Sequence, residues 1–277
     1  IHTMLASFLT VAFLIIGLSA YRMLRDDVTP AVQASLRLGI IMAAVLAPLQ
    51  IFTGDLHGLN TLEHQPAKVA AMEALWETQR GAPLVLFGLP DAETQSNKFA
   101  IELPGMASLI LTHDMQGEVK GINEFPDAHP PVAPVFWSFR VMVGIGILML
   151  LASWAAAWSL RRKSGLSPLL LTGLVAMTFS GWVGVLAGWY TTEIGRQPFL
   201  VTGVLRTADA VTSVSAGNIG LTLALYLLLY AVLITAYVTV VFYLARQAGQ
   251  ADSKTSEPTA HGPRVLAGKA ATEGGHA

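Results

Sequence analysis

A few ionisable or metal-binding side chains accompany the long apolar stretches of this sequence, and these side chains could do chemistry. Arg140 lies inside the apolar text FWSFRVMVG, and His2 is the only histidine attached to an apolar stretch. An ionisable group at membrane depth marks a functional site by default. Imidazole is a common ligand of metals and of haem iron, and the thioether of Met142 is a possible axial haem ligand.

Each of these side chains also has a plain structural interpretation. Arg140 lies near a helix end, where a long side chain can reach the headgroups by snorkelling. A histidine at a helix mouth, such as His2, is more often an interfacial residue, and Met142 could simply fill a gap in the core. The residue types alone leave both interpretations open.

The stretch GWYTTEIGRQPF ends the fourth apolar run with an acid and a base. Glu193 stands three residues before Arg196, Trp189 lies one turn earlier, and Pro198 prevents the helix from continuing. One interpretation is an exposed ion pair, which contributes only about 0–1 kcal/mol. The other is an anionic ligand or proton acceptor at Glu193, with Arg196 binding an acidic group such as a propionate.

Five apolar stretches must position these residues, because each is close to the length that spans a bilayer as a helix. They cover residues 3–23, 36–52, 135–160, 166–190 and 219–245. The fold class predicted is therefore all-α, a polytopic membrane helix bundle with about five transmembrane helices and a long outer loop. His2, Arg140, Met142 and Glu193 would then fall near one face, as a cofactor site between helices requires.

Composition and charge agree with a membrane-embedded protein. Of the 277 residues, 53% are hydrophobic and 13% are charged, the net charge is −1, and there is no cysteine. Disulfides and thiolate sites are thereby excluded, and nothing points to nucleic acid. Arginine and lysine gather in the turns after the first and third stretches and beyond the fifth, so we assign those places to the cytoplasm. The long loop then lies outside.

The outer loop, 53–134, is too long for a plain linker. Its text QPAKVAAMEALWETQ predicts an amphipathic helix that begins at Pro66, whereas PLVLFGLPD and NKFAIELPG look extended. Lys68 and Glu73 would project about 140° apart on that helix. They are therefore not an internal salt bridge, and each is either a solvated charge or a group that contacts something else.

In combination, these segments resemble subunit I of the cytochrome bd quinol oxidases, in its short-loop branch. The resemblance extends to about Arg246 and rests on the following segments, in this order: HTMLASFLTVAFLIIGLSAYRML, GD at 54–55, QPAKVAAMEALWET, FGLPD, NKFAIELP, FRVMVG, GWYTTEIGRQP and TADAVTSVSAG. The resemblance implies a quinol:oxygen oxidoreductase of the bacterial inner membrane. Quinol and oxygen would be its substrates, and a second membrane subunit its partner.

The resemblance also implies roles for single residues. His2 and Met142 match the axial ligands of a low-spin haem b, and Arg140 matches an arginine beside that haem. Glu193 matches the ligand of a high-spin haem b, and a third haem would be of d or b type. Two neighbours of the high-spin haems and two loop residues tied to quinol oxidation also have matches. These are Trp189, Arg196, Lys68 and Glu73.

The chain is expected to divide into two helices (1–52), the quinol-binding loop (53–134), three helices (135–246) and a disordered cytoplasmic tail (247–277). Family members have four further helices before the first one here, and the sequence opens without an initiator methionine. We therefore expect an N-terminal part to be missing, without which the enzyme would be inactive. Two alternatives remain open, a cofactor-free transporter or channel bundle and an inert fragment.

Overall fold

The structure is a computed structural model that describes residues 1–162 and 165–255, with 249–255 described as backbone only. Within these described residues, five helical spans are long and apolar enough to cross a membrane. Their helices are α1 (His2–Met23), α2 (Pro30–His64), α5 (Val132–Arg161), α6 (Pro168–Ala176) with α7 (Ser180–Ile194), and α8 (Ala216–Thr255). The predicted all-α membrane bundle is confirmed.

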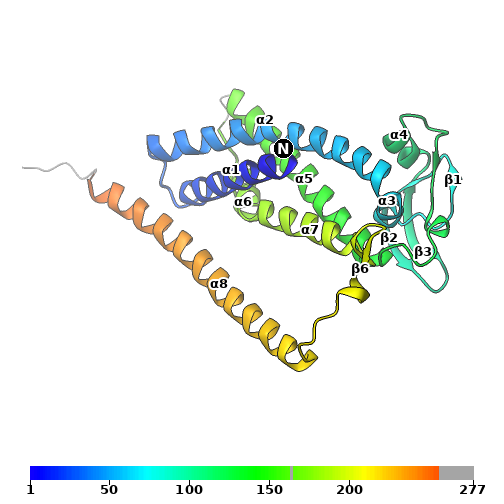
Figure 1. The fold of residues 1–277 in the computed structure, drawn as a ribbon. Coiled ribbons are helices and arrows are strands. Elements are labelled where there is room, and N and C mark those ends of the chain that lie inside the picture. Colours follow the sequence, from blue (N-terminus) through cyan, green and yellow to red (C-terminus); the bar gives the residue numbers. More distant parts are fainter. Residues whose placement is uncertain (163–164, 256–277) are drawn as a thin grey trace, which may run out of the picture.

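Helices α1, α2, α5 and α6 pack around one apolar core, and α7 lies alongside α5 and α1 (Figure 1). Phe13, Ile16, Ile40 and Leu174 are among its fully buried side chains. Helix α8 runs obliquely away from this bundle and approaches α1 near its far end, where the Arg246 side chain donates to the Tyr21 hydroxyl. The bundle is thus formed by the first four spans, and α8 exposes apolar side chains along most of its length.

Helix α2 is longer than the apolar stretch 36–52 that predicted it. It begins at Pro30, where the Thr29 hydroxyl accepts the Val32 amide, and it ends at His64. The helix continues beyond the apolar stretch through polar residues at both ends. Hydropathy therefore predicted the membrane-spanning part of α2 but not where the helix begins and ends. His57, which we expected in the loop, therefore lies on α2.

The fourth span is broken where an uninterrupted helix was expected over 166–190. Between α6 and α7, the hydroxyls of Thr178 and Ser180 donate to the carbonyl oxygens of Val175 and Met177. Such side-chain hydrogen bonds compete with the helical backbone. The Thr178 side chain also packs directly against Gly17 of α1, where no Cβ atom would fit. The break is therefore fixed by neighbouring groups.

The loop domain, residues 66–131, lies beyond the end of the bundle where α2 ends and α5 begins (Figure 1). We call this end of the bundle the loop end. The two longer strands of the loop domain form an antiparallel hairpin, which confirms that PLVLFGLPD and NKFAIELPG are extended. Its elements are α3 (Pro66–Glu73), β1 (Gln79–Arg80), β2 (Leu84–Asp91), β3 (Ser96–Leu103), α4 (Met106–Thr112), β4 (Glu118–Val119) and the 3₁₀ turn η1 (Ile122–Glu124).

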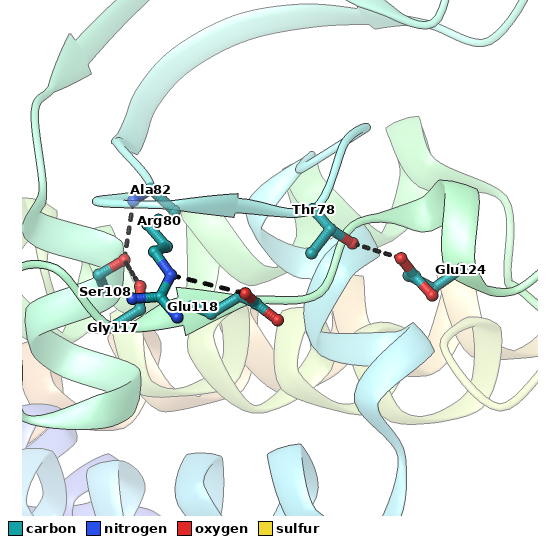
Figure 2. A network of polar contacts seen from close by, with 7 residues as sticks. All are labelled: Thr78, Arg80, Ala82, Ser108, Gly117, Glu118 and Glu124. Carbon is teal, nitrogen blue, oxygen red and sulfur yellow. Dashed lines mark hydrogen bonds and ion pairs between the residues drawn. The ribbon is translucent and has the colours of Figure 1, made fainter.

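Polar side chains tie the segments of the loop domain together (Figure 2). The buried Ser108 hydroxyl accepts the Ala82 amide and donates to the Gly117 carbonyl oxygen, each over 2.7 Å. Thr78 donates to Glu124 over 3.0 Å, and Arg80 pairs with Glu118 at 3.7 Å beside the β1–β4 ladder. Because a buried polar group costs free energy unless it is bonded, the two hydrogen bonds of Ser108 favour one arrangement of the loop.

The connection from α7 to α8 contains β5 (Phe199–Val201), β6 (Leu205–Arg206) and the 3₁₀ turn η2 (Thr207–Ala210). The tail was expected to be disordered from residue 247; α8 is described as helix to Thr255, and the disorder of the tail stays a prediction. Residues 256–277 lie outside the described residues. The division into two helices, loop, three helices and tail stays a prediction, and α2 crosses its first boundary.

Candidate functional site

Helix α3 positions the two charged loop residues. It begins at Pro66, as the sequence predicted, and its apolar side buries Val69 and Met72. It ends at Glu73 because Ala74 turns into the left-handed region, with φ 51°. Lys68 and Glu73 project in different directions and have different neighbours, as their spacing predicted.

Glu73 forms a buried ion pair with Arg140 of α5. Arg140 Nη2 lies 2.7 Å from Glu73 Oε2, and Arg140 Nε donates to the Val85 carbonyl oxygen over 2.6 Å. The two side chains are only 11% and 8% exposed, and the guanidinium also lies over the Phe136 ring at 4.8 Å. Arg140 is thus held by the loop domain through Glu73 and Val85, and it does not extend to the headgroups as the snorkelling interpretation expected.

Lys68 lies against the end of α7. A Cβ atom at Gly195 would lie 3.0 Å from Lys68 Cγ. Burial lowers the pKa of the Lys68 ammonium, the Arg196 guanidinium lowers it further, and the Glu193 carboxylate raises it. Lys68 is therefore a partly desolvated cation that interacts electrostatically with both Glu193 and Arg196.

Glu193 forms a local pair with Arg196. Glu193 Oε1 lies 2.6 Å from Arg196 Nη2, and the side chains are 38% and 35% exposed. Trp189, one turn earlier, is 57% exposed. The geometry matches the exposed-pair interpretation, and the ligand role of Glu193 stays a prediction.

His2 is surrounded by the second half of α2. Its Nε2 lies 3.1 Å from Gln50 Nε2, its Nδ1 lies 3.4 Å from Thr53 Oγ1, and its ring stacks on His57 with centroids 6.1 Å apart. A Cβ atom at Gly54 would lie 3.1 Å from the imidazole. Gln50 Oε1 is buried without a hydrogen bond. The imidazole is therefore oriented by polar groups beside an unsatisfied acceptor.

Met142 contacts α7, where a Cβ atom at Gly188 would lie 2.8 Å from its sulfur. Helices α1 and α7 run antiparallel, with Thr10 packed on Gly181. At about 1.5 Å per residue, His2 lies about 12 Å from Thr10, and Gly188 lies about 10 Å from Gly181 in the same direction. His2 and Met142 therefore lie at similar depth.

The structure joins some predicted residues and separates others. It joins Arg140 to Glu73, and it places Lys68 beside Glu193 and Arg196. Sequence reasoning missed the residues that hold these groups. They are Val85, which acts through a backbone carbonyl, and the neighbours of His2, namely Gln50, Thr53 and His57.

Comparison with known proteins identifies the family. The sequence profile of "Cytochrome bd terminal oxidase subunit I" matches residues 1–249. A Bacillus subtilis (strain 168) protein, provisionally named as subunit I of a cytochrome bd menaquinol oxidase, is 33% identical over 89% of this chain. Subunit 1 of the cytochrome bd ubiquinol oxidase of the same organism is 31% identical over 84% of it.

A solved structure has the same fold. The bd oxidase from Geobacillus thermodenitrificans superposes with a TM-score of 0.80 at 32% identity, over 89% of this chain. The chain spans about half the length of these proteins, covering 56% and 52% of the two relatives and 57% of the solved chain. The match includes the bundle and the loop domain, so the chain belongs to the cytochrome bd terminal oxidase subunit I family.

Proposed function

We propose that this chain is the quinol-oxidising, haem-binding part of a terminal oxidase, with the buried Glu73–Arg140 pair at its quinol site. That pair is the observation on which the proposal rests. Glu73 of the loop and Arg140 of a membrane helix lie 2.7 Å apart. The resemblance implies a role in quinol oxidation for Glu73 and a place beside the low-spin haem for Arg140. Met142 follows Arg140 within one turn of α5, which brings quinol and haem roles to one place.

The residues around His2 and Met142 fit a low-spin haem b. The ligand set is an imidazole and a thioether at similar depth, each against a glycine that leaves room for it. Thr53 lies beside His2 Nδ1, and Gln50 Nε2 lies 3.1 Å from His2 Nε2, so iron ligation through Nε2 would require the Gln50 amide to move aside. The unsatisfied Gln50 Oε1 marks a polar position that is not completed by the protein. Haem, when bound, supplies the one-electron acceptor that quinol oxidation requires.

Glu193 fits the ligand of a high-spin haem b. Its present cation is Arg196, and the pair is exposed enough to be exchanged at small cost. Arg196 is then available to bind a propionate, and Trp189 lies one turn of helix before Glu193. The third haem, of d or b type, would have its ligands outside this chain.

In the quinol reaction, the side chains of this chain would bind, orient and accept protons. Lys68 Nζ is a donor for a quinol oxygen, and the Glu73 carboxylate is the acceptor for a quinol proton. Arg140 fixes Glu73 through Nη2, while Val85 fixes Arg140 through Nε. Because Arg140 holds this carboxylate and is itself held by β2, the carboxylate is preorganised for transfer.

The loop end is the outer side of the bacterial inner membrane in this proposal, and α8 ends in the cytoplasm. The arginines at the opposite end include Arg22, Arg25 and Arg161, as the positive-inside rule requires. Quinol oxidation would then release protons outside. Oxygen reduction would need the second membrane subunit and the further part of subunit I that the relatives have. Family membership also argues against a transporter.

Variants in the assembled oxidase test the quinol site. Glu73→Gln or Lys68→Ala should lower quinol-dependent oxygen consumption, while a small artificial electron donor should still support it. Glu77→Gln is the matched control, because Glu77 lies just beyond α3 on the exposed side. Equal loss with quinol and with the artificial donor would mean that α3 is only structural.

A further inference from the structure

The end of α3 has a backbone conformation that its own sequence does not favour. Ala74 adopts φ 51° and ψ 40°, the left-handed region that is sterically unfavourable for a residue with a Cβ atom. Helices that end this way usually have glycine at that position. Ala74 directly follows Glu73, so this turn decides where the Glu73 carboxylate points. Backbone hydrogen bonds close the turn, from the Ala74 amide to Ala71 and from the Leu75 amide to Ala70, and a side chain outside α3 also holds it.

Asn97 of β3 makes two hydrogen bonds across this turn. Its Nδ2 donates to the Ala74 carbonyl oxygen over 3.0 Å, and its Oδ1 accepts from the Trp76 indole over 3.0 Å. Both polar atoms of the amide are used, one as donor and one as acceptor. A carboxylate could not donate, and a hydroxyl could not reach both partners. The contact therefore requires an amide of this length.

The same hairpin also holds the other member of the ion pair. In β2, the Val85 carbonyl oxygen accepts from Arg140 Nε over 2.6 Å. In β3, Asn97 fixes the residues that follow Glu73. The two strands are paired antiparallel, with Pro90 opposite Asn97 and Val85 opposite Glu102. The same two-stranded sheet thus contacts Arg140 directly and also contacts the turn that follows Glu73.

We propose that Asn97 is a positioning residue for quinol oxidation, which acts by holding the Ala74 turn so that Glu73 meets Arg140. This inference rests on the proposed role of Glu73. Asn97 touches neither member of the pair, so its effect must pass through α3. Residues that act through one another show non-additive effects, whereas independent residues add.

The test compares Asn97→Ala and Asn97→Asp with Glu73→Gln in the assembled oxidase. Asn97→Asp keeps the acceptor for Trp76, removes the donor to Ala74, and places a carboxylate oxygen against the carbonyl. Each Asn97 variant should lower quinol kcat/KM about tenfold, the scale of one buried hydrogen bond. Hydrogen exchange in residues 70–78 should become faster. Haem absorbance and turnover with an artificial donor should not change.

Two further variants make the result decisive. Adding Asn97→Ala to Glu73→Gln should cause no further loss of quinol oxidation, because the residue it positions is already gone. Lys98→Ala removes the exposed pair with Asp91 from the same hairpin and should leave turnover unchanged.

An Asn97→Ala enzyme with normal quinol kcat/KM, or a full additional loss in the double variant, would overturn the inference. If Glu73→Gln itself oxidised quinol normally, the proposed function would fail instead. The two failures are therefore distinguishable.

Discussion

Two ion pairs near the loop end are alike in length and different in construction. Arg140 and Glu73 join a membrane helix to the loop domain at 2.7 Å, whereas Glu193 and Arg196 join one turn of chain at 2.6 Å. The first pair is almost buried, and the second is more than a third exposed. Distance therefore does not distinguish them, but the solvent around them does.

The difference in burial decides what each pair is suited to do. Removing one member of a buried pair leaves an uncompensated charge, which typically costs about 3–5 kcal/mol. Breaking an exposed pair costs about 0–1 kcal/mol. The Arg140–Glu73 pair is thus suited to hold a geometry. The Glu193–Arg196 pair is suited to exchange its partner, as the proposed iron ligand must.

The largest effect is expected at the buried pair. Arg140→Leu leaves the Glu73 carboxylate buried without its cation, so the loop domain should lose about 3 kcal/mol of stability. Quinol oxidation should fall at least about a hundredfold, by the two decades that such a loss represents. Hydrogen exchange of α3 and quinol-dependent oxygen consumption measure these effects.

Arg140→Lys is the matched control for charge. A lysine keeps the cation but not the planar fork that reaches both Glu73 and Val85, so an intermediate effect is expected. Unchanged exchange in Arg140→Leu would show that the pair does not hold the loop.

A smaller effect on stability is expected at the exposed pair. Glu193→Gln should change stability by less than about 1 kcal/mol, because solvent already screens both side chains. The high-spin haem b absorbance should nevertheless be lost, because an amide does not replace the anionic ligand. Thermal unfolding and reduced-minus-oxidised spectra measure the two effects. Retained high-spin spectra together with normal oxygen turnover would make Glu193 a surface residue.

The smallest effect concerns Lys68, which lies between the pairs. Its pKa is lowered from 10.5, so the folded state binds fewer protons than the unfolded state between the lowered pKa and 10.5. Stability should therefore rise with pH across that window, since the cost of the buried charge is relieved there. Lys68→Met should remove this slope. Glu193→Gln should extend the window downward, because the carboxylate raises the pKa of Lys68.

The sequence predicted elements better than it predicted contacts. Pro66 and the apolar spacing predicted where α3 begins and which side it buries, because these signals are local. The spacing of Lys68 and Glu73 excluded a bond between them without naming their partners. The Glu73–Arg140 contact joins residues far apart in the chain, and no local pattern encodes it.

The Val85 contact and the break in the fourth span differed in how far the sequence could predict them. Val85 holds Arg140 through its carbonyl oxygen, a group that every residue has, so residue type could not reveal it. The break in the fourth span had a usable signal, because Thr178 and Ser180 interrupt an apolar run with hydroxyls that can bond their own helix. Long-range packing on Gly17 was not predictable from either residue.

The central claim is that this chain binds a low-spin haem b through His2 and Met142 next to a quinol site. Reduced-minus-oxidised spectra of the assembled oxidase carrying Met142→Leu test it most directly, with Met149→Leu, a buried methionine of the same helix, as control. Loss of the low-spin haem b absorbance is expected in Met142→Leu alone, with unchanged helix content. Normal low-spin absorbance in Met142→Leu would contradict it.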